Sequence, residues 1–220
     1  MTTLMSAPVA ALLERLFSEA ENVQTPALAE FAALPVAERE RMLNSKTEYR
    51  AVYARLKDVA IPVSRETGTL LYMLARSSQA RVIVEFGTSF GISTLHLAAA
   101  LRDNGGGRLI TTEFEPSKAQ RARDNLAAGG LLDLVEIREG DALETLRTGL
   151  PEQIDMLLLD GAKGLYFDVL RLLEDRLRPG ALIIADNADY CPEYVAQIRN
   201  PDGGYLSLPF PGEVELSMKR

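Results

Sequence analysis

From Arg81 onward, short runs of β-branched and aliphatic residues alternate with helical segments. This alternation predicts right-handed βαβ units, and therefore a mostly parallel sheet with helices on both faces, the Rossmann-like class of α/β fold. Strands are expected at 82–86, 108–113, 134–138, 156–160 and 181–186. Helices are expected at 94–102, 117–128 and 166–177, and one more after Pro192. Residues 205–210 and 214–218 flank Pro211-Gly212 and predict an antiparallel hairpin that completes a sheet of seven strands.

The first 62 residues have a helical pattern instead. Leu12, Leu13, Leu16 and Phe17 form one apolar face, and Pro35 suits a helix start. We expect residues 1–62 to be a helical extension of the same domain that caps the substrate or contacts a second subunit. Residues 63–220 would then form the main domain, whose helix at 66–78 is best explained by ordinary core packing.

Composition excludes several classes of function. The formal net charge of −7 would repel phosphate backbones, so nucleic acid is an unlikely partner. The single cysteine, Cys191, and the single histidine, His96, exclude a disulfide framework and a Cys/His zinc site. His96 lies in an apolar helical stretch and is expected in the core. The apolar run from Leu4 to Leu13 has no basic leader and falls short of the roughly 20 residues of a membrane span, so we expect a cytoplasmic protein with no membrane partner.

A glycine-rich turn follows the first predicted strand. Gly87 allows a tight bend, but Ser89 occupies the middle position where a dinucleotide site normally has glycine to admit a pyrophosphate. S-adenosylmethionine has no pyrophosphate. Its ammonium group could donate to Glu85, and its carboxylate could meet Ser93 and the free N–H groups of the helix start. Taken alone, the turn is about as well explained by a structural strand-to-helix connection.

The next two strands also end in acidic residues. Glu113 ends the second strand, where ribose hydroxyls are held in such folds. Asp141 follows the third strand and could accept from an adenine amino group, while Gly140 keeps the cavity wall thin. Each of these acids could instead cap a helix. Because three acidic strand ends meet at one edge of a parallel sheet, ligand binding is the favoured interpretation.

Carboxylates after the fourth and fifth strands indicate a metal site. Asp160, Asp186 and Asn187 offer the oxygen ligands that Mg²⁺ prefers. The alternative is an Asx-type turn at Asp186 and Asn187 with Asp160 capping a helix. Lys163 stands three residues past Asp160 and is a candidate general base toward a hydroxyl, or a simple ion-pair partner of Asp160.

These motifs together resemble the cation-dependent O-methyltransferase family that includes catechol O-methyltransferase and the caffeoyl-coenzyme A O-methyltransferases. The resemblance covers nearly the whole chain. Its most specific elements are Val84-Glu85-Phe86-Gly87, Thr112-Glu113, Asp160-Gly161-Ala162-Lys163 and Ala185-Asp186-Asn187.

The resemblance implies a class I S-adenosylmethionine-dependent methyltransferase. Glu85 and Ser93 would hold the methionine end, Glu113 the ribose, and Phe114 with Ala142 the adenine. Val63 would line the cofactor pocket. The divalent cation, Mg²⁺ with Mn²⁺ or Ca²⁺ as alternatives, would lie on Asp160, Asp186 and Asn187. Lys163 would be the general base. Glu215, or alternatively Glu213, would contact a second hydroxyl of the substrate. The resemblance also implies a homodimer.

One departure concerns the acceptor. Gly161-Ala162 replaces the bulky aromatics that catechol enzymes place beside the metal, and the chain has no tryptophan. The entrance to the site is therefore expected to be wider than in the catechol enzymes. The acceptor is expected to be a small catechol-like or phenolic molecule, which need not be catechol itself. Two alternatives stay open: methylation of a hydroxylated tRNA base, with Arg121, Arg123 and Arg147 as a basic patch, and a non-catalytic S-adenosylmethionine-binding module.

Overall fold

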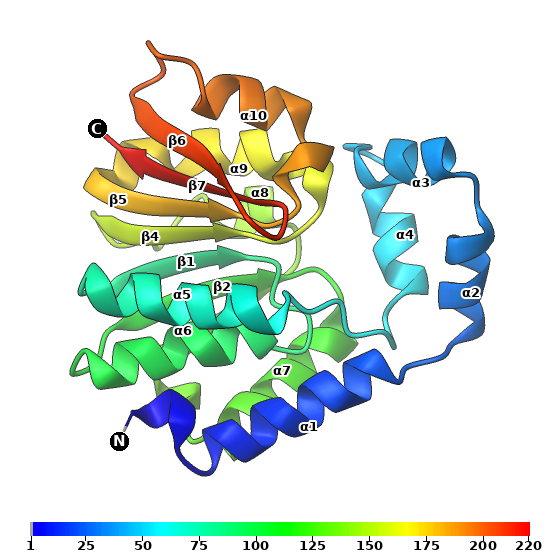
Figure 1. Cartoon of the computed structure of the whole chain (residues 1–220), viewed down its shortest axis with the longest axis horizontal. Coiled ribbons are helices and arrows are strands. Elements are labelled where there is room, and N and C mark those ends of the chain that lie inside the picture. Colours follow the sequence, from blue (N-terminus) through cyan, green and yellow to red (C-terminus); the bar gives the residue numbers. More distant parts are fainter. Residues whose placement is uncertain (1) are drawn as a thin grey trace.

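The computed structural model describes residues 2–220 and contains one seven-stranded sheet (Figure 1). The strands are β1 (Val82–Phe86), β2 (Arg108–Glu113), β3 (Val135–Glu139), β4 (Ile154–Leu159), β5 (Leu177–Ala185), β6 (Tyr205–Phe210) and β7 (Val214–Lys219). They follow the order β3-β2-β1-β4-β5-β7-β6, in which the first five run parallel and β7 pairs antiparallel with both β5 and β6. The predicted fold class, with its closing hairpin, is confirmed.

Ten α-helices accompany these strands in residues 2–220. They are α1 (Val9–Glu21), α2 (Pro26–Ala33), α3 (Val36–Leu43), α4 (Tyr49–Arg55), α5 (Arg65–Ser77), α6 (Ile92–Asp103), α7 (Pro116–Ala128), α8 (Ala142–Thr145), α9 (Tyr166–Leu173) and α10 (Pro192–Ile198). Short 3₁₀ turns lie at Thr3–Met5, Leu132–Leu134, Lys163–Leu165, Glu174–Arg176 and Ala188–Tyr190. None of the helices is long and apolar enough to cross a membrane.

Successive strand residues supply two cores, one on each face of the sheet. Ile83 and Leu158 pack into the core beneath α1, α5 and α6, while Val84 and Leu157 pack into the core beneath α9 and α10. A strand buried on both faces reads as a continuous apolar run because side chains alternate between the faces. This explains why β1 and β4 are almost entirely aliphatic.

The predicted element boundaries differ from the structure mainly at β5. The strand begins at Leu177, which pairs with Ile154, and the register then shifts so that Met156 pairs with Leu182. The segment Arg178-Pro179-Gly180 therefore lies inside an irregular strand rather than after a helix. The helix before it ends at Leu173 and continues as a 3₁₀ turn.

The first 62 residues divide into two parts with different packing. Helix α1 belongs to the main core, through the apolar face that includes Leu12 and Phe17. Helices α2, α3 and α4 form a separate lobe (residues 23–60, called the cap lobe below) with a small core around Val52, Leu56 and Val59. Figure 1 shows the cap lobe beyond the carboxyl ends of β1 and β4, apart from the layers that cover the sheet.

Candidate functional site

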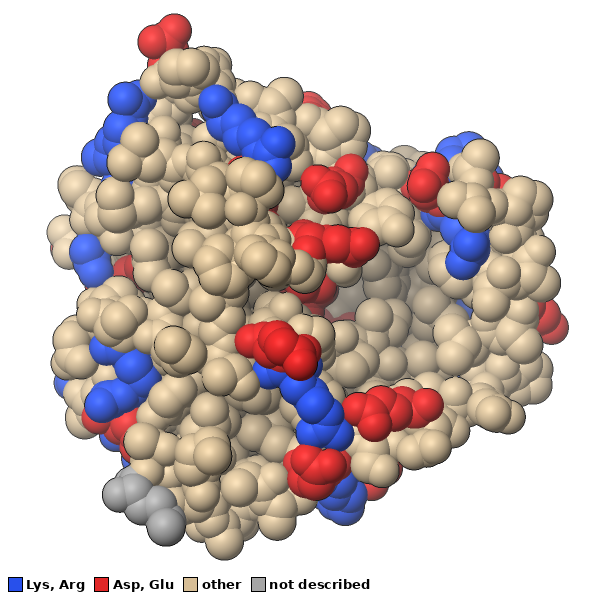
Figure 2. All heavy atoms as spheres, viewed as in Figure 1, with Lys and Arg blue, Asp and Glu red and all other residues tan. Residues whose placement is uncertain are grey.

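A cavity of about 290 Å³ lies between the cap lobe and the carboxyl ends of the parallel strands. Figure 2 shows it as a hollow between the lobe and the body of the molecule. The body contributes Phe86, Gly87, Ser89, Thr112, Glu113, Phe114, Lys118, Gly140, Asp141, Ala142, Asp160, Gly161, Ala162, Lys163, Leu165 and Asn187. The cap lobe contributes Leu28, Phe31, Leu43, Tyr49, Tyr53, Leu56 and Val59. In open α/β sheets, ligands bind at this edge of the sheet.

The glycine-rich turn approaches the neighbouring strand closely. Gly87 has a φ of +104°, and a Cβ there would lie 2.6 Å from the backbone oxygen of Asp160. Any side chain would therefore force the turn away from β4. Gly91 also has a positive φ, but a Cβ there would meet Ala122 of α7 at 3.3 Å. Gly91 therefore serves packing between helices, whereas Gly87 shapes the cavity.

Glu85 is completely buried at the end of β1. Ser93 donates to one carboxylate oxygen at 2.5 Å, and Thr94 donates to the other at 2.6 Å. Burial raises the pKa of Glu85. Ser93, which was predicted to meet the carboxylate of the donor, thus donates to Glu85 instead, and Thr94 does the same; its place one residue after Ser93 was the available signal. A buried carboxylate without a cationic partner is suited to an ammonium group.

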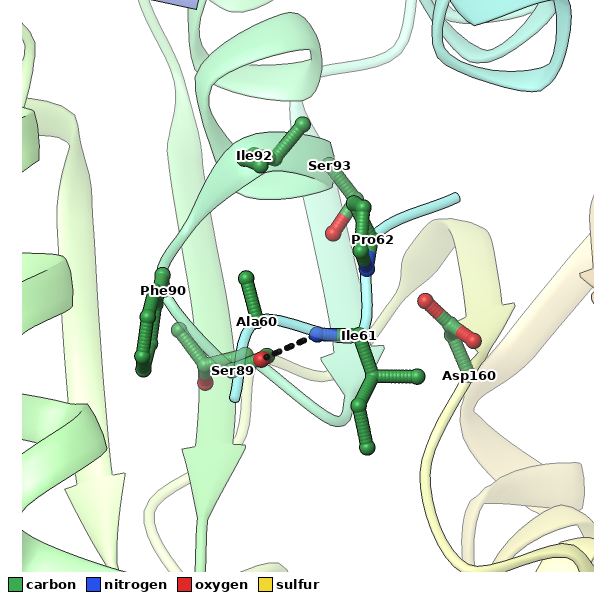
Figure 3. Close-up of a pocket in the computed structure, with 9 residues that line it drawn as sticks. Ala60, Ile61, Pro62, Ser89, Phe90, Ile92, Ser93 and Asp160 are labelled. Atoms are coloured by element: carbon green, nitrogen blue, oxygen red, sulfur yellow. Dashed lines mark hydrogen bonds between the residues drawn. The ribbon is translucent and has the colours of Figure 1, made fainter. Parts of the chain in front are cut away.

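A second, small pocket adjoins the glycine-rich turn (Figure 3). The segment Ala60-Ile61-Pro62 passes over the turn, and the backbone N–H of Ile61 donates to Ser89 Oγ at 3.4 Å. Asp160 faces this segment from the opposite side. Val63, predicted to line the cofactor pocket, is instead buried in the main core and is not among the lining residues, so Ile61 and Pro62 form this wall.

Glu113 ends β2 and is held by backbone N–H groups. Ser89 donates to one carboxylate oxygen at 2.8 Å and Glu115 to the other at 2.9 Å. Burial raises the pKa of Glu113, and the nearby charge of Lys118 opposes this shift. Lys118 also lines the cavity; it was not predicted, because a single lysine in an amphipathic helix gives no signal. Phe114 lines the cavity beside Glu113, as expected.

Asp141 performs two structural tasks at the cavity edge. Its Oδ1 accepts from the N–H of Leu143 at 2.9 Å and caps α8, and its Oδ2 accepts from Arg50 of the cap lobe at 2.5 Å. The capping alternative is therefore realised, while Asp141, Gly140 and Ala142 all line the cavity as expected. Arg50 could not be foreseen, since it comes from a helix far away in the sequence.

Asp160 and Asp186 come together at the ends of β4 and β5. Asp186 is buried and the side chain of Asp160 is 11% exposed, and burial together with their mutual repulsion raises the pKa of Asp160 to about 8. Burial also raises the pKa of Asp186, and the charge of Lys163 lowers the pKa of both. Asn187 follows in a left-handed conformation with φ +52°, and its Nδ2 donates to Glu213 at 3.1 Å. Asn187 lines the cavity.

These oxygens fit a hard divalent cation. Two buried carboxylates that repel each other gain stability from added positive charge, and two carboxylates with one amide leave positions for water or substrate. In residues 2–220 no three His, Cys, Asp or Glu side chains converge on a possible ion. The candidate set therefore depends on the amide oxygen of Asn187 as its third protein ligand.

Lys163 is buried beside this carboxylate pair. Its Nζ donates to the hydroxyl of Tyr166 at 2.7 Å and to the backbone oxygen of Asp186 at 3.1 Å, and it lies 3.4 Å from Asp160 Oδ1. Tyr166 in turn donates to the same Asp186 oxygen at 2.9 Å. The predicted ion pair between Lys163 and Asp160 is present, but the shortest contact of Nζ is to Tyr166. The sequence analysis did not predict this contact, although Tyr166 follows Lys163 by three residues.

Glu215 does not reach the cavity. It is buried in β7, where Arg199 donates to it at 2.8 and 2.6 Å and Ser207 at 2.5 Å. These contacts hold its pKa below the usual range despite burial. The alternative, Glu213, is exposed in the β6–β7 turn beside Asn187. Glu213 lies in the turn before β7 begins, whereas Glu215 lies two residues further along, inside the packed strand, so Glu213 is the acid beside Asn187.

Comparison with known proteins adds an independent finding. A family model described as a methyltransferase domain matches residues 84–188. Over 131 residues the chain is 40% identical to a catechol O-methyltransferase of Niastella koreensis, a match that covers 58% of each protein. Over 159 residues it is 30% identical to a putative O-methyltransferase of a Mycobacterium species, covering 70% of each. The chain thus spans little more than half the length of the Niastella koreensis enzyme.

A solved structure is similar over nearly the whole chain. The O-methyltransferase TomG of Streptomyces achromogenes, involved in tomaymycin synthesis and solved in complex with S-adenosylmethionine, has a TM-score of 0.65 and 26% sequence identity. The match covers 94% of this chain and 95% of that one. The structural similarity therefore extends over the cap lobe as well as the sheet.

Proposed function

Because the chain belongs to the O-methyltransferase family that includes the catechol O-methyltransferases, we propose that it methylates a hydroxyl of a small phenolic or catechol-like acceptor. The methyl donor is S-adenosylmethionine, and a divalent cation assists. The observation that carries the proposal is that Lys163 and Asp160, with Asp186 beside them, line the same cavity as Glu113 and Phe114. The cavity thus combines acid–base groups with groups that suit a nucleoside.

The side chains around the cavity have distinct tasks in this proposal. Glu85 receives the ammonium of the donor, Glu113 the ribose hydroxyls, and Phe114 with Ala142 flanks the adenine. Asp141 borders the cavity and contacts Arg50. When bound, S-adenosylmethionine supplies an electrophilic methyl group, and a cation on Asp160, Asp186 and Asn187 supplies positive charge that favours ionisation of a phenol, whose unperturbed pKa is about 10.

Lys163 collects the proton of the acceptor. In its uncharged form, Lys163 would take the proton of the acceptor hydroxyl at Nζ and become ammonium, and S-adenosylmethionine, when bound, would supply the methyl group that the oxygen gains. Tyr166 and the Asp186 carbonyl fix the position of Nζ. Holding the reactants face to face removes translational entropy from the barrier. The cap lobe covers the cavity and limits access of water.

Methyl transfer to catechols, hydroxycinnamates and other phenols, with and without added Mg²⁺, tests the proposal. We expect turnover that excess EDTA abolishes and Mg²⁺ restores. Asp186→Asn should lose most activity, whereas Asp189→Asn, an exposed acid in the same loop, should keep it. Full activity in EDTA would contradict the role of the cation. Tight S-adenosylmethionine binding without transfer to any acceptor would favour a non-catalytic module instead.

The proposal includes a homodimer. Leu206 and Leu208 of β6 and Met218 of β7 are 57%, 53% and 37% exposed on the hairpin at the sheet edge. Apolar side chains gathered on an exposed strand favour an interaction surface. Light scattering coupled to gel filtration should give twice the mass of one chain for the wild-type protein and the mass of one chain for Leu208→Glu. A monomeric wild-type protein would contradict the proposed homodimer but not the proposed activity.

A further inference from the structure

The two walls of the cavity differ in chemistry. The body supplies charged groups, including Glu113, Lys118 and Asp160. The cap lobe supplies only aliphatic and aromatic side chains: Leu28, Phe31, Leu43, Tyr49, Tyr53, Leu56 and Val59. The same lobe carries charged residues such as Arg41 and Arg55, and none of them lines the cavity. The apolar character of this wall is therefore a property of the face turned to the cavity rather than of the lobe as a whole.

Folding of the lobe does not account for every apolar residue on this wall. Leu56 and Val59 belong to the core of the lobe, and Leu28 and Phe31 pack against it. Leu43, at the end of α3, lines the cavity but belongs to none of the three apolar clusters in residues 2–220. Leu43 is only partly buried, so a ligand that covers it adds apolar contact area.

The two lysines that line the cavity, Lys118 and Lys163, both lie near acidic groups. Lys118 lies near Glu113, and Lys163 is engaged by Tyr166 and the Asp186 carbonyl. Outside the lining, Arg50 is paired with Asp141, and Lys46 with Asp168 and Glu193. Figure 2 shows acidic side chains along the upper and lower edges of the hollow. A carboxylate or phosphate on the acceptor would lose its hydration here and would face these acidic groups.

We infer that the acceptor carries an uncharged, apolar body of several carbon atoms, which lies against Leu43 under the cap lobe while its hydroxyl faces Lys163. Acceptors with an anionic tail, such as hydroxycinnamates or coenzyme A thioesters, are then disfavoured. This inference rests on the proposed function and narrows its substrate class. In this view the apolar lining of the cap lobe and the acidic side chains at the edge of the cavity select the acceptor. The residues of the body carry out methyl transfer.

Two matched acceptor series test the inference. The first is catechol with a methyl, propyl or pentyl group at carbon 4, and the second is the same ring with a terminal carboxylate on chains of equal length. In the first series we expect each added methylene to lower KM by about threefold to fourfold, the effect of burying one methylene. At equal length, the carboxylate should lower kcat/KM by at least tenfold.

A matched pair of variants locates the effect. Leu43→Ser should raise KM for 4-pentylcatechol by about tenfold and leave KM for catechol and for S-adenosylmethionine within about twofold. Val36→Ser alters the same helix at a side chain that is 60% exposed and should change none of these values. Unchanged catechol kinetics in Leu43→Ser also establish that the variant is folded.

The outcomes separate this inference from the proposed function. Methylation of all the catechols without dependence on the tail, or a preference for the carboxylate series, would overturn the inference alone. An equal effect of Leu43→Ser on catechol and 4-pentylcatechol would overturn the role of Leu43. Failure to methylate any phenol would overturn the proposed function itself, and the inference with it.

Discussion

Arg50 of the cap lobe is paired with Asp141 of the body at 2.5 Å, across the edge of the cavity. Lys46 is likewise paired with Asp168 at 2.8 Å and with Glu193 at 3.1 Å. Near these ion pairs, Gly164 admits the backbone of Asn44 so closely that a Cβ would lie 2.4 Å from its carbonyl oxygen. The cap lobe has its own small core and is connected to the body by these polar contacts and by Tyr49 and Tyr53, which pack against the body.

Removal of both ion pairs should loosen the lobe without unfolding the body. We expect Lys46→Ala with Arg50→Ala to raise the rate of protease cleavage within residues 23–60 by roughly two- to fivefold, because exposed ion pairs contribute little. The midpoint of thermal unfolding should stay unchanged. Arg41→Ala is the control, since its partner, Glu48, lies in the same lobe. Equal cleavage in the double variant and in Arg41→Ala would contradict this view of the lobe.

Tyr166→Phe should impair catalysis more than cofactor binding. The hydroxyl of Tyr166 joins Lys163 Nζ to the Asp186 carbonyl, so its loss leaves Nζ less well positioned. We expect kcat to fall by roughly five- to twentyfold, the dissociation constant of S-adenosylmethionine to stay the same, and the free energy of unfolding to fall by about 1 kcal/mol.

Tyr205→Phe provides the matched control for Tyr166→Phe. It removes a comparable hydroxyl, which donates to Glu174 at 2.8 Å away from the cavity. The expected result is a similar loss of unfolding free energy with unchanged kcat. If the two variants lose kcat equally, Tyr166 acts only through stability and has no particular part in holding Lys163.

The sequence predicted those site residues that strands position. Glu85 and Glu113 lie at the ends of β1 and β2, Asp160 and Asp186 follow β4 and β5, and the carboxyl ends of parallel strands share one edge of the sheet. Residues whose place depends on tertiary packing were not predictable. Leu43 reaches the cavity, and Arg50 its edge, because the chain leaves α1 and folds over the sheet edge, and no local pattern encodes that path.

Two errors at the site have local causes. Glu215 was assigned to the substrate by similarity, but the alternation of side chains in β7 turns it toward Arg199. Val63 was assigned to the cofactor pocket, but it begins the packed approach to α5, and the preceding residues Ile61 and Pro62 line the pocket. In both regions the sequence gives the element correctly, and a shift of one or two residues decides which side chain faces the cavity.

His96 should make the protein less stable as the pH falls below 6.5. Burial lowers the pKa of His96, only partly offset by its hydrogen bond to the Ile92 carbonyl. At a pH between the lowered pKa of His96 in the folded protein and its pKa of about 6.5 in the unfolded chain, only the unfolded chain binds the proton. The free energy of unfolding therefore falls on acidification below pH 6.5, by at most about 1.4 kcal/mol per pH unit.

Comparison with His96→Gln isolates this effect, because His96 is the single histidine of the chain. The raised pKa values of Glu85 and Glu113 act in the opposite sense, since a carboxyl that binds its proton more tightly when folded gains stability as the pH falls. Urea unfolding of both proteins at pH 5.5 and 7.5 should therefore show a more favourable change for the variant on acidification. Identical changes in the two proteins would contradict a role for His96.

Gly68→Ala should destabilise the protein although alanine is the better helix former. Gly68 lies in α5, and a Cβ there would lie 2.7 Å from two atoms of the His96 ring. The helix gains about 1 kcal/mol from alanine, but overpacking of a buried ring that also contacts Phe17 costs more, so we expect a net loss of about 1–2 kcal/mol in the free energy of unfolding. Thr69→Ala, at the next and exposed position, should not destabilise the helix.

A double variant tests the cause of this loss. Adding His96→Ser to Gly68→Ala makes room for the new methyl group, so the double variant should be more stable, by about 1 kcal/mol or more, than the summed effects of the two single variants predict. Strict additivity in urea unfolding would show that the close approach of α5 to His96 does not require a glycine.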